Sequence, residues 1–272
     1  MGDFDVCFVN DGLVPTASAH IGLTDRGLTL GDAVFETMRV RGGRVIDIDG
    51  HLARLRAAVE CLGFAEAPDS RALSVALEDT RAANGMVEGV LRLTVTRGAG
   101  GRGLAPAADL RPTVIVTASA LPVRSPGFRA VTASVTRRNE QSPLSQIKST
   151  SYLDNILALR EALSRGADDA LLLNTRGCAA CFSAANLVVR RGAVVMTPPL
   201  ADGVMPGTVR RRMLEQLPIR EASLTVAELA LADEIIATNS LGIRQLVELD
   251  GKALSSEPIL FGQARAVYDA LT

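Results

Sequence analysis

Short apolar runs separated by glycine-containing turns, with few helices among them, are the feature that most limits how this chain can fold. In the second half of the chain these runs cover residues 130–136, 170–173, 185–189, 194–197, 234–237 and 245–249. Apolar runs of this length, bounded by turn residues, are typical of buried strands. Many short strands in succession favour a curved sheet or a barrel.

The first half of the chain mixes strands with amphipathic helices. Strands are predicted at residues 6–10, 33–40, 45–48, 90–96 and 112–118, and helices at 51–62 and 70–83. Further helices are predicted at residues 152–164, 209–216 and 226–231 and near the C-terminus. The 272 residues suffice for two domains. We therefore predict an α/β fold with a small α/β domain over residues 1–118, a linker with two prolines over 119–127, and a larger domain over 128–272.

Charge and composition exclude several classes of protein. The 29 basic residues nearly balance the 30 acidic ones, which argues against nucleic acid or an anionic membrane as the main partner. The N-terminus carries acids where a signal peptide needs positive charge, and no stretch approaches the ~18 apolar residues of a membrane span. The four cysteines are too few and scattered for a disulfide framework. A cytoplasmic location is expected.

Cys178 and Cys181 form a lone CxxC pair. A structural zinc site needs two more ligands, and neither His20 nor His51 belongs to a second spaced pair. We therefore predict no metal site, and ordinary packing is the favoured role of both thiols. His51, at a helix start, is interpreted as a capping or packing residue.

Lysine is rare in this chain. Of the 29 basic residues only Lys148 and Lys252 are lysines. Lys148 lies in a hydroxyl-rich segment between a predicted strand and a predicted helix, where a partly desolvated amine could act as a nucleophile that forms a Schiff base. Spacing alone leaves open the alternative of a surface lysine in a loop. Lys252 follows a hairpin-like Asp-Gly turn and is expected to be an exposed charge.

Three further segments could bind anions. Residues 203–210 lead directly into a helix, whose free amides and dipole suit a phosphate, and residues 238–242 offer hydroxyls and amides after a strand. Both segments could also be ordinary turns. The loop Arg97-Gly98-Ala99-Gly100-Gly101-Arg102-Gly103 could grip a carboxylate with its guanidinium groups, or be a flexible hairpin loop. It lacks the spacing of a nucleotide-binding P-loop.

Taken in order along the chain, these motifs resemble the class IV aminotransferases, pyridoxal-phosphate enzymes of fold type IV. The segments that carry the resemblance are DRGLTLGDAVFET (25–37), HLARL (51–55), RGAGGRG (97–103), KSTSYLDN (148–155), AANL (184–187), TPPL (197–200), GVMPGTVR (203–210) and ATNSL (237–241). The resemblance implies a small N-terminal α/β domain and a larger C-terminal domain with a curved sheet or barrel.

The resemblance also implies a cofactor, pyridoxal 5′-phosphate, and roles around it. Lys148 would form the Schiff base and then move the proton at the substrate Cα, and Arg54 would pair with the cofactor phosphate. The remaining phosphate hydrogen bonds would come from the amides of Thr208 and Val209 and from Asn239 and Ser240. A homodimer is implied as well, with the active site completed by a loop of the partner.

Within the family, the loop sequence is most similar to that of 4-amino-4-deoxychorismate lyases, which make 4-aminobenzoate and pyruvate for folate synthesis. Substrate binding is then implied for Arg102, Arg97 and Phe35, and Thr37 could help to protonate the departing pyruvate. D-amino-acid transaminases are less similar, since they place Tyr at Phe35 and His at Leu104. Branched-chain transaminases lack the double-glycine loop.

One residue departs from the family pattern. The family places a glutamate at the position of Cys181, where it keeps the pyridine nitrogen of the cofactor protonated. A neutral thiol could donate only a weak hydrogen bond, so the ring would be a poorer electron sink. We expect this to harm transamination more than an elimination driven by aromatisation. The alternatives are an amino-acid transaminase of D- or branched-chain type, or a catalytically silent homologue that binds the cofactor. The role of Tyr152 stays open.

Overall fold

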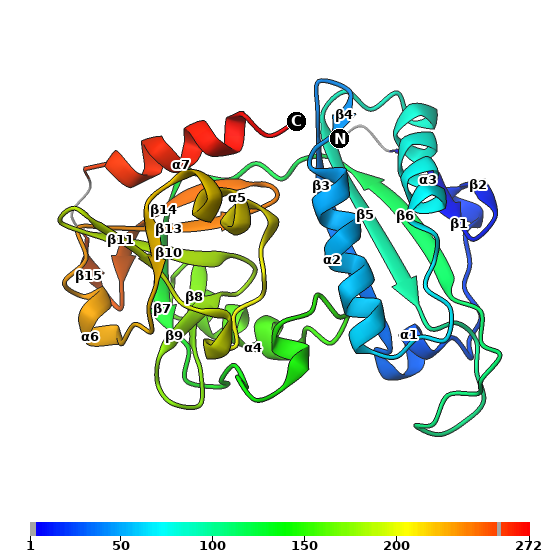
Figure 1. The fold of residues 1–272 in the computed structure, drawn as a ribbon, viewed down its shortest axis with the longest axis horizontal. Helices are drawn as coiled ribbons and strands as arrows, with labels where there is room; N and C mark the ends of the chain where they lie inside the picture. Colours follow the sequence, from blue (N-terminus) through cyan, green and yellow to red (C-terminus); the bar gives the residue numbers. More distant parts are fainter. Residues whose placement is uncertain (1–3, 255–256) are drawn as a thin grey trace. The chain divides into compact units, whose positions relative to one another are not determined.

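The computed structural model describes residues 4–254 and 257–272, which form two compact units (Figure 1). Unit 1 comprises the described residues up to Pro122, with Ile147–Ser151 and Thr272, and unit 2 comprises the rest. We predicted Lys148 in the second domain, whereas the structure groups its segment with unit 1. The reason is backbone pairing: the Phe35 amide donates to the Lys148 carbonyl at 2.8 Å, and the Thr150 amide donates to Ala33 at 2.9 Å.

Unit 1 is built on a six-stranded sheet with the order β2-β1-β6-β5-β3-β4. Its strands are β1 (Val6–Val9), β2 (Gly12–Pro15), β3 (Ala33–Arg41), β4 (Arg44–Val45), β5 (Gly89–Thr96) and β6 (Thr113–Ser119). Gly42 and Gly43 connect β3 to β4 with φ of 56° and 73°. Two successive left-handed residues give the tight hairpin turn whose twist matches the strands.

Helices cover one face of this sheet (Figure 1). They are α2 (Ile48–Cys61) and α3 (Ser70–Ala83), while the short α1 (Arg26–Leu30) precedes β3 and the 3-10 turn η1 (Thr16–Ser18) follows β2. Asp69 caps α3 by accepting a hydrogen bond from the Ala72 amide at 2.9 Å. The apolar faces of both helices pack on the sheet in one buried cluster that includes Leu52, Leu55, Leu73, Leu77, Met38 and Leu91.

Unit 2 contains a barrel, as predicted. Its six strands follow one another in the order β10-β13-β14-β7-β8-β9, and the pairing of Cys181 with Asn186 joins β9 back to β10. They are β7 (Gly127–Thr132), β8 (Asp169–Leu173), β9 (Ala179–Phe182), β10 (Asn186–Arg191), β13 (Glu234–Asn239) and β14 (Gly242–Leu249). Three strands extend this sheet: β11 (Val194–Thr197), β12 (Ile219–Glu221) and β15 (Lys252–Ala253).

The largest buried side chains of unit 2 belong to the barrel strands. Phe128 and Phe182 meet edge to face with ring centroids 5.0 Å apart, and both are about 1% exposed. The helices are α4 (Leu153–Ser164), α5 (Thr208–Gln216), α6 (Val226–Leu229) and α7 (Ile259–Asp269), with 3-10 turns η2 (Pro143–Ser145) and η3 (Leu200–Asp202). α7 packs along β13 and β14 and against α5 (Figure 1).

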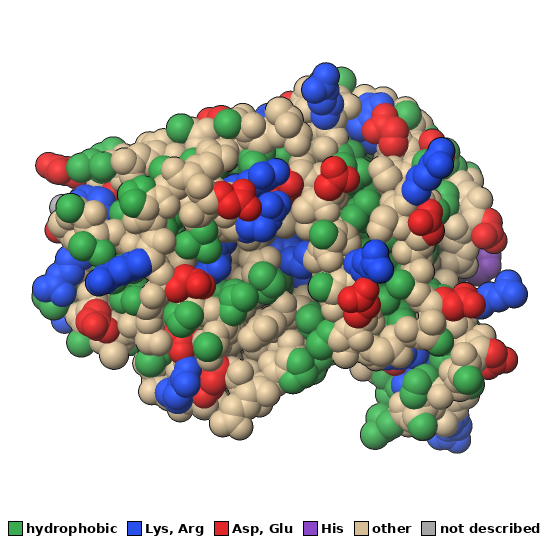
Figure 2. Space-filling model, viewed as in Figure 1, with side chains coloured by type: hydrophobic (Ala, Val, Ile, Leu, Met, Phe, Trp, Pro, Cys, Tyr) green, Lys and Arg blue, Asp and Glu red, His purple; other side chains and the backbone are tan. Residues whose placement is uncertain are grey.

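The surface agrees with the charge balance of the sequence. Acidic and basic side chains are interspersed on the face shown in Figure 2. Among the helices of the described residues, none has both the length and the apolar character needed to cross a bilayer.

Candidate active site

Lys148 presents its amine to the aromatic ring of Phe35 in unit 1. The ammonium nitrogen Nζ lies 4.2 Å from the centroid of that ring. Burial lowers the pKa of Lys148 to about 8; the charges of Arg54 and Arg92 act in the same direction, and the Glu36 charge opposes them. At pH 7.4 about a fifth of this amine is therefore neutral, against about a thousandth of an ordinary lysine, and the neutral form is the nucleophile.

A buried carboxylate, Glu36, organises the residues next to Lys148. Glu36 lies on β3 and is fully buried, and its two oxygens accept hydrogen bonds from Arg54 Nε at 2.7 Å and Arg54 Nη2 at 2.5 Å. His51 Nδ1 lies 2.6 Å from Glu36 Oε2. Burial alone would raise the pKa of Glu36, but the charge and hydrogen bonds of Arg54, together with those of His51, lower it to about 2. The carboxylate thus stays ionised, and Nδ1 of His51 must be the donor.

This network differs from the sequence analysis in two respects. Arg54 was predicted to pair with a phosphate, and in the structure its guanidinium is bidentate with Glu36. Glu36 was not predicted to be part of the site. His51 is buried at the start of α2, as expected of a packing residue, and also supplies a hydrogen bond to the carboxylate.

Arg92 is a second residue that the sequence analysis missed. Its guanidinium carbon lies 3.6 Å from the centroid of the Phe35 ring, so that this ring contacts two cationic side chains, Arg92 and Lys148. Arg92 is opposite Thr37 in the pairing of β5 with β3, and Phe35 and Thr37 lie two residues apart on β3. Alternation along the strand places these three side chains on one face.

Unit 2 holds the residues predicted to bind a phosphate. Thr208 and Val209 are the first residues of α5, and both are buried. The N-cap residue, Gly207, makes no side-chain capping bond, and a Cβ there would lie only 1.9 Å from Asn186 Oδ1. The start of α5 therefore lies close to the side-chain amide of Asn186, and its first backbone N–H groups are available to bind an anion.

A row of polar side chains runs across the barrel strands beside this helix start. Cys181 is paired with Asn186, and Asn186 with Thr238, so the three side chains lie on one face. Asn186 donates to the Met205 carbonyl at 2.9 Å. Thr238 Oγ1 is buried and has no hydrogen-bond partner in the described part of the chain. Burial raises the pKa of the Cys181 thiol, so this position is a neutral thiol at physiological pH.

The remaining predicted residues of unit 2 lie at the ends of its elements. Asn239 ends β13 and donates to the Ala184 carbonyl at 3.0 Å. Ser240 follows in the turn to β14, and its carbonyl accepts a hydrogen bond from Tyr268 at 3.1 Å. Tyr152 is the N-cap residue of α4.

The two arginines of the glycine loop between β5 and β6 lie in different environments. Arg97 is buried, and its guanidinium donates to Asp32 at 2.7 Å and to the Leu62 and Gly63 carbonyls at 2.6 and 2.9 Å. This arrangement fixes the start of the loop to the end of α2, in contrast to the predicted substrate contact. Arg102, in the middle of the loop, is exposed.

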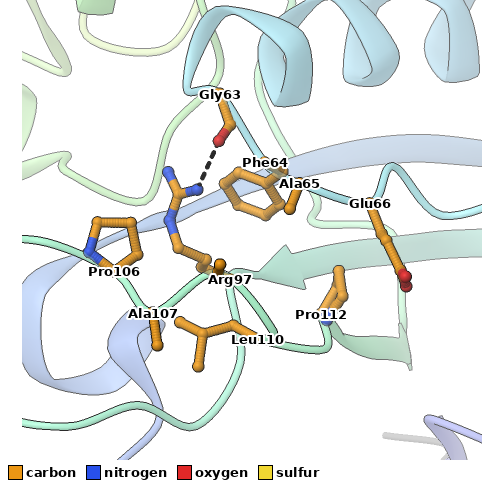
Figure 3. Close-up of a pocket in the computed structure, with 10 residues that line it drawn as sticks. Gly63, Phe64, Ala65, Glu66, Arg97, Pro106, Ala107, Leu110 and Pro112 are labelled. Atoms are coloured by element: carbon orange, nitrogen blue, oxygen red, sulfur yellow. Dashed lines mark hydrogen bonds between the residues drawn. The ribbon is translucent and has the colours of Figure 1, made fainter.

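Figure 3 shows the pocket that lies between this loop and the segment after α2. Its volume is about 150 Å³, and Arg97 stacks on the Phe64 ring at one wall with 4.3 Å between guanidinium carbon and centroid. Pro106, Ala107 and Leu110 line the loop side. This small, mostly apolar pocket does not contain Lys148.

Comparisons with known proteins agree with this architecture. Residues 33–249 match the model of the family described as amino-transferase class IV, so the chain belongs to the class IV aminotransferases, enzymes that use pyridoxal 5′-phosphate. A protein of Methanocaldococcus jannaschii, provisionally named a branched-chain-amino-acid aminotransferase, is 30% identical over 262 residues, which are 93% of this chain and 90% of the relative.

Two solved structures are similar over nearly their whole length. A Legionella pneumophila protein provisionally named 4-amino-4-deoxychorismate lyase is 27% identical with a TM-score of 0.88, covering 93% of this chain and 96% of the other. The pyridoxal-phosphate-bound form of a hypothetical aminotransferase of Mycobacterium tuberculosis is 25% identical with a TM-score of 0.86, covering 97% and 98%. The fold type IV predicted from the sequence is thereby confirmed.

The residues present fit an aldehyde cofactor that carries a phosphate. Taken by itself, unit 1 contains a half-buried amine with a lowered pKa. Taken by itself, unit 2 contains an uncapped helix start beside the buried hydroxyl of Thr238, which has no hydrogen-bond partner among the described residues. An amine of this kind can condense with an aldehyde, and the helix start can hold a dianion. No cluster of three metal-binding side chains occurs among residues 4–254 and 257–272.

Proposed function

We propose that this chain is a pyridoxal-phosphate-dependent lyase that converts 4-amino-4-deoxychorismate to 4-aminobenzoate and pyruvate. The observation that carries the proposal is the Lys148 amine, held against Phe35 with its pKa lowered to about 8. The loop sequence Arg-Gly-Ala-Gly-Gly-Arg-Gly and the likeness to the Legionella protein support the lyase within the family.

Each proposed role follows from the chemistry of a side chain. The bound cofactor would withdraw electrons from the substrate carbon that carries the amine. Lys148 would hold the cofactor aldehyde and, once displaced by the substrate amine, take the proton from that carbon through Nζ. Thr37 would donate a proton to the methylene carbon of the departing enolpyruvyl group as its carbon–oxygen bond breaks.

Binding of the cofactor phosphate is proposed for a small set of residues. These are Arg54, the amides of Thr208 and Val209, and the polar side chains of Asn239 and Ser240. Arg54 already has a carboxylate partner, Glu36, so we propose that it binds the phosphate while Glu36 holds the plane of its guanidinium. Substrate carboxylates would be held by Arg102, and Phe35 would pack against the substrate ring.

Cys181 favours the lyase over a transaminase. The family pattern that the sequence resembles has a carboxylate at this position, and in this chain a buried neutral thiol replaces it. A thiol cannot keep the ring nitrogen protonated, so the cofactor would stabilise a carbanion less well. Elimination of pyruvate gains the aromatic ring of 4-aminobenzoate and depends less on that stabilisation, whereas transamination must return a proton to the cofactor carbon.

The deciding experiment is a single-turnover reaction with 4-amino-4-deoxychorismate and no keto acid. We expect 4-aminobenzoate and pyruvate in equal amounts from the wild-type protein and neither product from Lys148→Ala. Borohydride reduction of the cofactor-loaded wild type should add the mass of the reduced cofactor to the peptide that contains residue 148. Products that form only when a keto acid is supplied would instead identify a transaminase.

The alternative function is an amino-acid transaminase of D- or branched-chain type, favoured by the 30% identity to the Methanocaldococcus protein. Cys181→Glu separates the two functions. On the lyase hypothesis this variant gains transaminase turnover at least about tenfold, because the ring nitrogen regains a carboxylate partner. Unchanged transaminase turnover contradicts the role given to Cys181. A cofactor absorbance that no amino substrate changes would indicate a catalytically silent homologue. A cytoplasmic homodimer is proposed as the working form.

A further inference from the structure

We propose that Arg26 is a positioning residue for Arg102: it fixes the glycine loop between β5 and β6 so that Arg102 is presented to a substrate carboxylate. The inference rests on the proposed function, since it names the residue that makes the substrate-binding arginine effective.

Arg26 is a buried arginine whose donors are directed at the loop. Its side chain is 5% exposed, Nη1 donates to the Gly103 carbonyl at 3.0 Å, and Nη2 donates to the Leu104 carbonyl at 2.7 Å. Nε donates to Asp32 Oδ2 at 2.9 Å. Guanidinium is planar, with donors in a fixed fork, so three simultaneous hydrogen bonds set both its own orientation and that of the two carbonyls.

Asp32 joins this arginine to the start of the loop. Its Oδ2 accepts from Arg26 and also from Arg97 Nε at 2.7 Å. Burial alone would raise the pKa of Asp32, but the hydrogen bonds and charges of the two arginines lower it. Because Arg97 also holds the carbonyls at the end of α2, the Asp32 carboxylate connects the middle of the loop to the body of unit 1.

The loop is attached on both sides of Arg102. On one side the Gly100 amide donates to the Thr24 carbonyl at 3.0 Å, and on the other side the Gly103 and Leu104 carbonyls accept from Arg26. Only Gly101 and Arg102 lie between these attachments. A short arc fixed at both ends confines the backbone of Arg102, and its exposed side chain extends from that arc.

The rest of the loop provides little packing that could replace Arg26. The loop projects from the sheet in Figure 1, and Figure 2 shows hydrophobic side chains on its outer surface; Leu104 is 84% exposed. The 150 Å³ pocket of Figure 3 separates part of its later residues from the segment after α2. Hydrogen bonds from Arg26 are thus the main tether of residues 103–104 to unit 1.

A double-mutant cycle on the cofactor-loaded enzyme tests the proposal. Arg102→Ala is expected to raise KM for 4-amino-4-deoxychorismate about thirtyfold, and Arg26→Lys about tenfold, with kcat within about threefold of wild type. Lysine keeps the charge beside Asp32 but lacks the planar fork. If Arg26 acts through Arg102, the double variant is no worse than Arg102→Ala within about twofold. Effects that multiply in the double variant overturn the proposal.

Limited trypsin digestion gives a readout that does not depend on activity. We expect cleavage after Arg102, measured relative to cleavage after the exposed Arg124, to be about tenfold faster in Arg26→Lys, because a released loop enters the protease more readily. Arg56→Lys, on the exposed face of α2, is the matched control and should leave the ratio unchanged.

Gly100→Ala is an independent variant for the same purpose. A Cβ at Gly100 would lie 3.1 Å from Arg26 Cδ and 3.3 Å from its Cγ, and should displace the arginine without removing it. Gly100→Ala is expected to increase cleavage after Arg102 relative to cleavage after Arg124, as Arg26→Lys does. Equal cleavage ratios in wild type, Arg26→Lys and Gly100→Ala would overturn the positioning role. If wild type lacked lyase activity while the ratios changed as expected, the proposed function would fail and the anchoring of Arg102 would stand.

Discussion

At the scale of single residues, the two lysines of this chain occupy opposite environments. Lys148 is half-buried, with its amine over the Phe35 ring and with Glu36, Arg54 and Arg92 as charged neighbours, and Lys252 is exposed at the start of β15. Burial disfavours the protonated amine, the charges of Arg54 and Arg92 act in the same direction, and the Glu36 charge opposes them. Burial is the largest cause of the lowered pKa, and these three charged side chains adjust it further.

The first prediction concerns the pH dependence of amine labelling in the cofactor-free protein. Only the neutral amine reacts with an acylating reagent, so labelling of Lys148 should rise with a midpoint near pH 8. Mass spectrometry resolves the two lysine peptides, and Lys252 is the internal reference for the exposed amine. Labelling of Lys148 that rises only in step with Lys252 would contradict the lowered pKa.

The second prediction concerns Glu36→Gln. Glu36 raises the pKa of Lys148, so its loss should move the Lys148 labelling midpoint below pH 8. The substitution also leaves the buried guanidinium of Arg54 without its carboxylate, and we expect the free energy of unfolding to fall by about 3–5 kcal/mol at pH 7. Glu60→Gln is the matched control, because its pair with Arg56 is exposed and should contribute less than about 1 kcal/mol.

The loss of stability in Glu36→Gln should also depend on pH. Folding lowers the pKa of Glu36 from 4.5 to about 2, so as the pH falls the unfolded chain is protonated at Glu36 before the folded protein is. The free energy of unfolding therefore decreases as the pH falls. This contribution is present in full above about pH 4.5 and amounts to about 3 kcal/mol. In urea titrations, the difference between wild type and Glu36→Gln should narrow between pH 5 and pH 3. A constant difference would show that folding does not lower the pKa of Glu36.

Rarity and local context single out Lys148 in the sequence as a candidate, but they do not point to the neighbours that the structure gives it. Glu36 and Arg92 look like ordinary strand residues in the sequence, because their roles depend on contacts between β3, β5 and α2. The Glu36 carboxylate meets Arg54 across 18 positions, and Arg92 meets Phe35 across 57. The spacing of Glu36, His51 and Arg54 carries no local pattern that would bring them together.

At the scale of elements, helices with clear end signals were predicted most accurately. α3 occupies the predicted residues 70–83, between the capping Asp69 and the Asn84-Gly85 stop. The sequence analysis missed α1, which has only five residues, and β9, whose four residues are all buried and show no alternation. β7 spans Gly127–Thr132 instead of the predicted 130–136, because its register is set by parallel pairing with β14.

The third prediction belongs to the start of α5. Gly207→Ala places a methyl group where Asn186 Oδ1 would be 1.9 Å away, so either Asn186 or the helix start must move. We expect affinity for pyridoxal 5′-phosphate to fall at least about tenfold, measured by the change in cofactor absorbance on titration. Gly262→Ala in α7 is the matched control: its Cβ would meet nothing within 4 Å, and alanine should stabilise that helix by about 0.5–1 kcal/mol. Unchanged cofactor affinity in Gly207→Ala would remove α5 from the phosphate site.

At the scale of the whole molecule, the segment around Lys148 is grouped in space with a different unit from the residues that precede and follow it in the sequence. Residues Ile147–Ser151 belong to unit 1, although the residues on both sides belong to unit 2. The Thr150 hydroxyl donates to Gly31 at 3.0 Å and, with the backbone bonds of Phe35 and Thr150, fixes the segment to the start of β3. A sequence read from one end cannot show this exchange, since it depends on pairing between positions more than 100 residues apart.

The fourth prediction tests the proposed homodimer through its active sites. If the glycine loop of one subunit completes the active site of its partner, each site takes Lys148 from one subunit and Arg102 from the other. Lys148→Ala and Arg102→Ala then remove groups that different subunits contribute to the same site. The variants are mixed under conditions that exchange subunits and assayed well below the wild-type KM, where Lys148→Ala is inactive and Arg102→Ala is at least about thirtyfold slower than wild type. About a quarter of wild-type activity should then return, because half of the dimers are mixed and each has one intact site. Sedimentation should show the same dimer before and after mixing. Activity that stays at the level of the separate variants, with exchange demonstrated by differently tagged chains, would mean that each loop serves its own subunit.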